Sequence, residues 1–165
     1  MKTVSVCFVC LGNICRSPTA EGVMRHLVEK EALSQRILID SAGTGDWHIG
    51  CAPDERAQHA AGQRGYKLTG LRGRQIGAAD FERFDLLVAM DDKNVAALRQ
   101  MCPPPMRDKI RLLMDFLPKD DSRWSGIREV ADPYFGGIEG FEQVLDQCEA
   151  ACRGLISALR AQWLA

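Results

Sequence analysis

The chain has 165 residues, a length that fits one domain with a sizeable core, and its 46% hydrophobic and 26% charged residues are typical of a globular protein. A formal net charge of −1 gives no basis for nonspecific attraction to nucleic acid or to membrane surfaces, and no run approaches the ~18 apolar residues of a membrane span. Seven cysteines, an odd number, favour a reducing compartment over a disulfide framework.

Apolar runs and helical spacing predict strands that alternate with helices. In chain order, the expected elements are a strand over 4–10, a helix over 18–32, a strand over 36–41, a helix over 53–64, a strand over 84–90, a helix over 91–100, a strand over 110–114 and a helix over 138–163. Residues 65–77 and 118–137 are predicted loops, and loops as long as the second are often functional. This order predicts an α/β fold in which residues 1–165 form a single three-layer domain, a four-stranded parallel sheet with helices on both faces.

The junction between the first strand and the first helix carries the strongest functional signal. Residues 10–18 read Cys-Leu-Gly-Asn-Ile-Cys-Arg-Ser-Pro. We expect Ser17 to be the N-cap and Pro18 the first helical residue. Backbone N–H groups and the helix dipole at such a helix start bind anions, phosphate above all. The sequence therefore predicts a phosphate site in which Cys10 lies beneath the anion as a thiolate nucleophile and Arg16 binds two phosphate oxygens.

The string from Cys10 to Pro18 resembles the signature loop of the low-molecular-weight protein tyrosine phosphatases. Cys-x5-Arg alone is a weak pattern with frequent chance matches, whereas the nine-residue string directly after an apolar strand is specific. The resemblance spans nearly the whole chain through further matching residues, namely Ser41, Trp47, Met90-Asp91 and Asp132-Pro133-Tyr134.

The resemblance implies a role for each site residue. Cys10 is the expected nucleophile, Arg16 the phosphate-binding cation, and Asp132 the general acid that protonates the leaving group and later activates water. The residues expected to bind phosphate along the loop are Leu11, Gly12, Asn13, Ile14, Cys15 and Ser17. Trp47 and Tyr134 are expected to form apolar walls of the mouth.

A supporting network behind the loop is also expected. Asn13 tolerates a positive φ, the Ser17 hydroxyl is expected to donate to the Cys10 sulfur, and Ser41 is expected to hydrogen-bond Asn13, as its family counterpart does. Many family members carry a histidine near the position of Leu71, so this part of the network is expected to differ here.

The cysteines near Cys10 admit other interpretations. Cys7-x2-Cys10 has the spacing of a redox or metal pair, but residues 7 and 10 leave opposite faces of a strand, so we assign Cys7 to the core. Cys15 is either a loop-packing thiol or the partner of Cys10 in a reversible disulfide that shields the nucleophile from further oxidation. No histidine or carboxylate is near enough to complete a tetrahedral site, and we expect neither a metal nor a cofactor.

Three alternatives to a phosphotyrosine phosphatase are considered. Arsenate reductase uses a similar loop but relays electrons through two further cysteines after the third strand, where residues 89–99 contain none. Protein-arginine phosphatases tend to carry threonine where this chain has Ile14. A catalytically inactive phosphate-binding module would not need Cys10, Arg16 and Asp132 together.

The resemblance also implies partners and location. Phosphotyrosine-containing proteins are the expected substrates, with a tyrosine kinase as counterpart, and the site is expected to bind phosphate-like oxyanions but neither nucleic acid nor membranes. We expect a monomer. Because the motif begins at Cys10, cleavage of a signal peptide would remove it, which favours a cytoplasmic protein.

Overall fold

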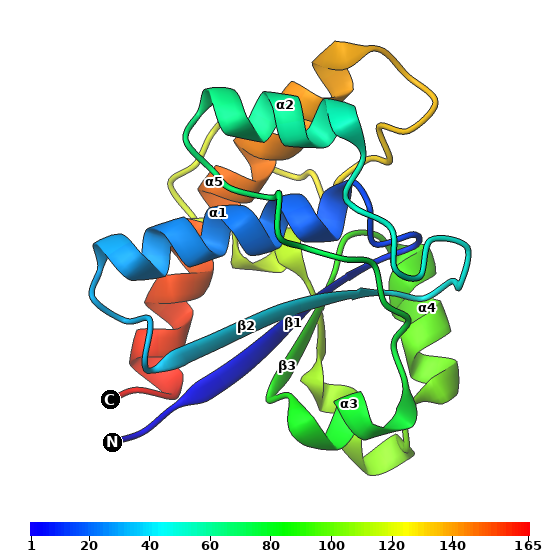
Figure 1. The fold of residues 1–165 in the computed structure, drawn as a ribbon. Helices are drawn as coiled ribbons and strands as arrows, with labels where there is room; N and C mark the ends of the chain where they lie inside the picture. Colours follow the sequence, from blue (N-terminus) through cyan, green and yellow to red (C-terminus); the bar gives the residue numbers. More distant parts are fainter.

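The computed structural model describes residues 1–165 as four parallel strands in the order β2-β1-β3-β4, with helices on both faces (Figure 1). The strands are β1 (Val4–Cys10), β2 (Ile37–Gly43), β3 (Leu86–Ala89) and β4 (Ile110–Leu112). The α-helices are α1 (Arg16–Lys30), α2 (Glu55–Gln63), α3 (Ala78–Arg83), α4 (Asp92–Met101) and α5 (Ile138–Gln162), and two 3-10 helices are η1 (Pro104–Lys109) and η2 (Leu113–Phe116). The predicted fold class is confirmed.

Strand alternation divides the core between the two faces of the sheet. Val6, Phe8 and Cys10 of β1 belong to a cluster of 34 buried residues that α1 and α5 cover. Cys7 and Val9 belong to a second cluster of 12 residues that α3 and α4 cover. The assignment of Cys7 to the core is confirmed, and burial raises the pKa of its thiol. Consequently Cys7 and Cys10 lie on opposite faces.

Helix caps fix the elements that follow β2 and β3. The Asp54 side chain accepts the N–H of Arg56 at 2.8 Å and caps α2. Asp91, two residues after the end of β3, forms a reciprocal capping box with Asn94 at the start of α4. Both carboxylates therefore have a structural role at the edge of the sheet where β1 also ends.

Several predicted boundaries were wrong. Helix α1 begins at Arg16 with Cys15 as N-cap, so Ser17 is not the cap and Pro18 is not the first helical residue. The reason is Asn13, whose positive φ of 56° turns the chain into the helix two residues early. Strand β2 continues to Gly43 because it pairs with β1 up to Cys10.

Three short helices were not predicted from the sequence. Helix α3 lies between the predicted loop over 65–77 and β3, and η1 follows α4. The predicted strand over 110–114 ends at Leu112, where η2 begins. The predicted loop over 65–77 touches the sheet through an isolated parallel bridge between Gln75 and Gly43. Helices of four to six residues have too few turns for periodicity to show.

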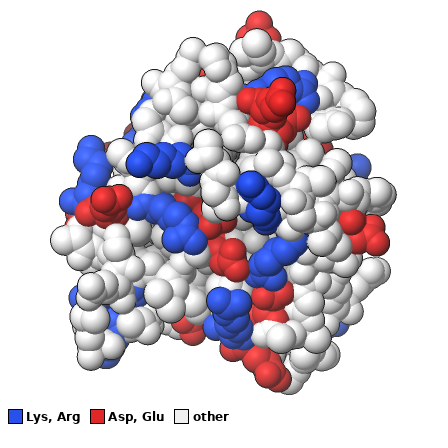
Figure 2. Space-filling model, viewed as in Figure 1, with Lys and Arg blue, Asp and Glu red and all other residues white.

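Charged residues of both signs are interspersed on the face shown in Figure 2, in agreement with the formal net charge of −1. None of the helices combines the length and the apolar character that crossing a membrane requires.

Gly154 provides a test of how tightly α5 packs against η2. A Cβ atom at this position would lie 1.7 Å from the backbone oxygen of Phe116, whereas a Cβ at Gly62 in α2 would meet nothing within 4 Å. We expect Gly154→Ala to lower the free energy of unfolding by about 1–3 kcal/mol, as overpacking does. Gly62→Ala is the control and is expected to raise it by about 0.5–1 kcal/mol. Urea denaturation measures both free energies of unfolding. An equal increase in the two variants would contradict the close packing of Gly154 against Phe116.

Candidate active site

The loop between β1 and α1 leaves a set of backbone donors without protein acceptors. Only the Asn13 N–H has one, the Sγ of Cys10 at 3.3 Å. The N–H groups that donate to no protein acceptor are those of Leu11, Gly12, Ile14, Cys15, Arg16 and Ser17. No side chain caps α1, so the dipole of this helix adds positive potential at the same place. Unpaired donors around one point form a cradle for an oxyanion.

Cys10 lies at the base of this cradle, at the end of β1. Its Sγ is 3.0 Å from the Oγ of Ser17, in addition to the contact with the Asn13 N–H. The side chain is buried but lines a pocket of about 210 Å³. The expected contact between Ser17 and the sulfur is confirmed, and a thiolate here can accept hydrogen bonds from both groups.

Arg16 is buried and held from two directions. Its Nη1 donates to Asp91 Oδ2 at 2.6 Å and to the backbone oxygen of Val130 at 3.0 Å. Burial opposes the charge, but Cys10 and Asp91 raise the pKa of Arg16 above its ordinary value. The guanidinium is therefore a fixed, permanent cation beside the sulfur. The sequence placed Asp91 among the residues that match the family but did not pair it with Arg16, because the two are 75 residues apart.

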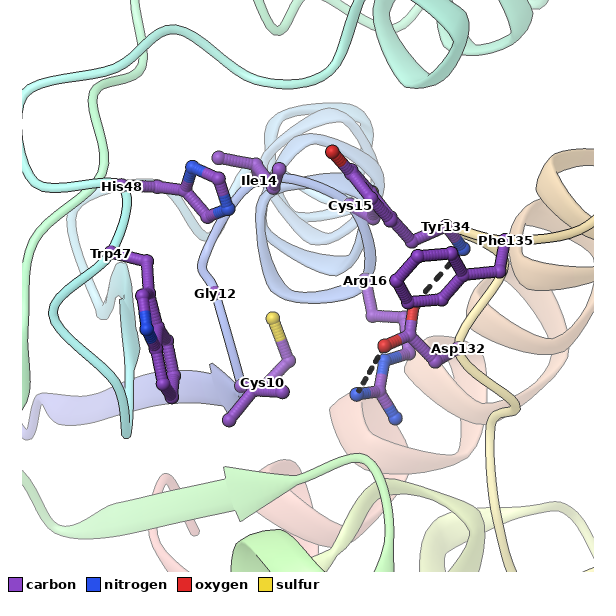
Figure 3. A pocket seen from close by; sticks show the side chains of 11 residues that line it. Cys10, Gly12, Ile14, Cys15, Arg16, Trp47, His48, Asp132, Tyr134 and Phe135 are labelled. Atoms are coloured by element: carbon purple, nitrogen blue, oxygen red, sulfur yellow. Dashed lines mark hydrogen bonds and ion pairs between the residues drawn. The ribbon is translucent and has the colours of Figure 1, made fainter.

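Asp132 reaches the same pocket from the long loop before α5 (Figure 3). Its Oδ1 accepts the N–H of Tyr134 at 3.0 Å, and its Oδ2 lies 3.8 Å from Nη2 of Arg16. The loop is tied to the sheet where the Val130 N–H donates to the Met90 oxygen. The carboxyl group is partly exposed, so it can exchange protons with solvent as well as with a bound molecule.

Asn13 organises the support behind the cradle. Its Nδ2 donates to the hydroxyl oxygens of Ser17 at 2.8 Å and Ser41 at 3.0 Å, and its Oδ1 accepts the N–H of Arg74 at 3.0 Å. The expected positive φ and the Ser41 contact are both confirmed. The contact with Arg74 was missed, because it is made by a backbone N–H, which every residue except proline has and which the sequence therefore does not reveal.

Glu21 completes this network and was also missed. The Ser41 hydroxyl donates to Glu21 Oε1 at 2.6 Å, and Oε2 pairs with Arg25 at 2.7 Å. Glu21 is only 2% exposed, and the Glu-x3-Arg spacing on a helix was the available signal. Leu71, near which the resemblance implies a histidine, packs against the core. The carboxylate of Glu21 accepts the Ser41 hydrogen bond in this chain without a histidine between them.

The mouth of the pocket is lined by Trp47 and Tyr134, as expected, and additionally by His48 and Phe135 (Figure 3). A Cβ at Gly12 would lie 3.0 Å from Cδ2 of His48, so the imidazole packs directly over the loop. His48 was missed, because no partner for it can be recognised in the sequence; its place next to Trp47 was the only available signal. These four side chains stand in two pairs on either side of the opening.

Cys15 is buried beside the cradle, and burial raises the pKa of its thiol to about 12. It is the N-cap of α1 and packs in the same core as Cys10. In the structure Cys15 is therefore a packing thiol. The reversible disulfide with Cys10 stays a prediction, to be tested by mapping peptides after peroxide treatment.

A thiol beneath unpaired amides, a fixed guanidinium and a carboxyl group at one pocket are the parts of a cysteine-dependent phosphatase on a parallel α/β sheet. The model of the low molecular weight phosphotyrosine protein phosphatase family matches residues 5–164. A Streptomyces coelicolor low molecular weight protein-tyrosine-phosphatase is 45% identical over 162 residues, which cover 97% of this chain and 96% of the relative.

Solved structures agree with this match. A protein tyrosine phosphatase from Entamoeba histolytica, crystallised with Hepes in the active site, has a TM-score of 0.89 and 38% identity and covers 96% of this chain and 98% of its own. Vibrio vulnificus Wzb, in complex with benzylphosphonate, has a TM-score of 0.79 and 26% identity, and the match covers 94% of this chain and 99% of the Wzb chain. The chain belongs to the low molecular weight phosphotyrosine protein phosphatase family, and it is a protein-tyrosine phosphatase, a hydrolase.

Replacing Ser41 tests the supporting network. Ser41→Ala leaves a buried Glu21 oxygen without its donor, so we expect the free energy of unfolding to fall by about 1–3 kcal/mol. Aryl phosphatase activity is expected to fall as well, because Asn13 loses one of its acceptors. Ser157→Ala, at an exposed position in α5, is the control and should stay within about 0.5 kcal/mol of wild type. Equal stability and equal activity of the Ser41→Ala and Ser157→Ala variants would contradict the role of Ser41.

Proposed function

We propose that this phosphatase hydrolyses phosphotyrosine in proteins through a phosphocysteine intermediate on Cys10. The thiolate attacks phosphorus in line, and the bond from phosphorus to the tyrosine oxygen breaks while Asp132 gives that oxygen its proton. Arg16 and the loop amides stabilise the equatorial oxygens of the transition state. The observation that supports this best is the cradle of six unpaired N–H groups around the pocket that Cys10, Arg16 and Asp132 share.

The second step regenerates the thiolate. Asp132, now ionised, takes a proton from water as the water oxygen attacks phosphorus, and the sulfur–phosphorus bond breaks to release inorganic phosphate. Ser17 Oγ, 3.0 Å from the sulfur, is proposed to donate to the departing thiolate. Asp132 thus acts from one position as the acid of the first step and the base of the second.

The walls of the pocket support an aromatic substrate. Ile14 of the loop and the rings of Trp47 and Tyr134 line the mouth, which suits the apolar faces of a phenyl ring. Ile14 also stands where threonine is typical of protein-arginine phosphatases. The benzylphosphonate complex of Wzb shows that a relative accepts an aryl ligand with a phosphate-like group.

The partners and setting follow from this reaction. We propose phosphotyrosine proteins as substrates, with a tyrosine kinase as the source of those phosphates, and the loop as a site for free oxyanions. Seven free cysteines, including the exposed Cys51, favour a reducing cytoplasm. A single domain over residues 1–165 that acts as a monomer is proposed, since the site is complete within one chain.

Cys10→Ser tests the nucleophile. We expect complete loss of p-nitrophenyl phosphate hydrolysis in EDTA, because a serine hydroxyl is not ionised near neutrality, and loss of a phosphoprotein trapped by acid quench. Cys51→Ser removes an exposed thiol outside the pocket and is expected to keep both. A phosphorylated species that persists in Cys10→Ser would contradict the assignment.

Asp132→Asn tests the general acid. The amide cannot protonate the leaving oxygen, so we expect kcat on phenyl phosphate to fall by about 10²–10⁴. The fall on p-nitrophenyl phosphate should be smaller, because nitrophenolate leaves without a proton. Asp120→Asn, an exposed position on the same loop, is the control and should change neither rate. Equal losses on the two esters would exclude Asp132 as the acid.

The phosphorylated residue that the site accepts can be tested directly. We expect hydrolysis of a phosphotyrosine peptide to exceed that of the matched phosphoarginine peptide, measured as kcat/KM. Ile14→Thr, compared with Ile14→Val as a control of equal branching, is expected to reduce this preference. A wild-type preference for phosphoarginine would contradict the proposed substrate.

A further inference from the structure

A second cavity lies next to the mouth, between α2 and the first turns of α5. Its volume is about 260 Å³, which suits one side chain. Ile138 and Phe141 supply its apolar surface, and Ile138, 65% exposed at the start of α5, is open to solvent. The catalytic mechanism uses none of the residues that line this cavity.

Arg56 joins this cavity to the active-site pocket. Its guanidinium lies 5.5 Å from the ring centre of Tyr134, a wall of the mouth, and 4.7 Å from that of Phe141, a wall of the second cavity. Its Nη2 also donates to the backbone oxygen of Tyr134 at 3.1 Å. Phe135, next to Tyr134, is 94% exposed, and the centres of the two rings are 4.9 Å apart (Figure 3). Arg56 therefore lies between the mouth and the cavity and contacts a side chain that lines each of them.

The charges in the cavity favour a cation. Arg56 is already neutralised by Asp54, which accepts from its Nε at 3.1 Å and its Nη2 at 3.0 Å. Glu142 is bound by Arg64 at 2.6 Å. Glu55, exposed in the first turn of α2, has no cationic partner. Among the Glu and Arg side chains that line the cavity, Glu55 is therefore the one without an ion-pair partner.

We propose that this cavity is a specificity subsite for an arginine or lysine that flanks the phosphotyrosine of the substrate protein. The inference rests on the proposed function, since it takes the phosphotyrosine to be seated over Cys10. The aliphatic stem packs on Ile138 and Phe141, and the cationic head pairs with Glu55. Such a side chain matches both halves of the cavity, whereas an acidic side chain would meet a like charge.

The test compares phosphotyrosine peptides in which arginine, norleucine, alanine or glutamate occupies each position from four residues before to four after the phosphotyrosine. At one position we expect kcat/KM to be about fivefold higher for arginine than for alanine, the upper range for an exposed ion pair. Glu55→Gln and Ile138→Ser should each reduce that ratio to below about twofold, whereas Glu82→Gln, an exposed position on α3, should leave it unchanged.

Hydrolysis of p-nitrophenyl phosphate, which is too small to reach the cavity, separates this proposal from the catalytic one. We expect the same rate on it in wild type, Glu55→Gln and Ile138→Ser. An arginine preference that is absent, that survives in both variants, or that norleucine equals would overturn the subsite. A wild-type enzyme inactive on p-nitrophenyl phosphate would instead contradict the proposed function.

Discussion

The site depends on one backbone feature, the left-handed turn at Asn13. Holding a non-glycine residue at a φ of 56° costs about 1–3 kcal/mol. The Asn13 residue offsets this cost with four hydrogen bonds, to Cys10, Ser17, Ser41 and from Arg74, each worth about 1 kcal/mol net. Because the chain turns here, the amides on both sides converge instead of pairing with one another. The anion cradle exists because of this turn.

The parallel sheet brings the remaining parts together. Cys10, Ser41 and Asp91 lie at or near the carboxyl ends of β1, β2 and β3, which meet at one edge of the sheet. The long loop before α5 adds Asp132 and is anchored at Val130, whose oxygen also binds Arg16. The cation and the proposed acid are thus positioned by the same segment, although 116 residues separate them in the sequence.

Much of this could be predicted from the sequence, and the failures have physical reasons. The alternation of strands and helices and the Cys10-to-Pro18 string were sufficient for the fold and the pocket. Ser17 was predicted as the N-cap of α1 because serine is common at that position. The prediction was wrong, since the Ser17 hydroxyl lies at the sulfur of Cys10 instead. The contacts of Glu21 with Ser41 and of His48 with Gly12 were missed because they are long-range, and single-sequence periodicity reports only neighbours along the chain.

The unpaired amides of the loop have a consequence for turnover. In the proposed mechanism, inorganic phosphate, once released, meets the same donors and the same guanidinium that held it as an ester. Product and substrate therefore compete for one cradle, and the rate depends on the ambient concentration of phosphate. A cell rich in phosphate would slow this enzyme without any dedicated inhibitor.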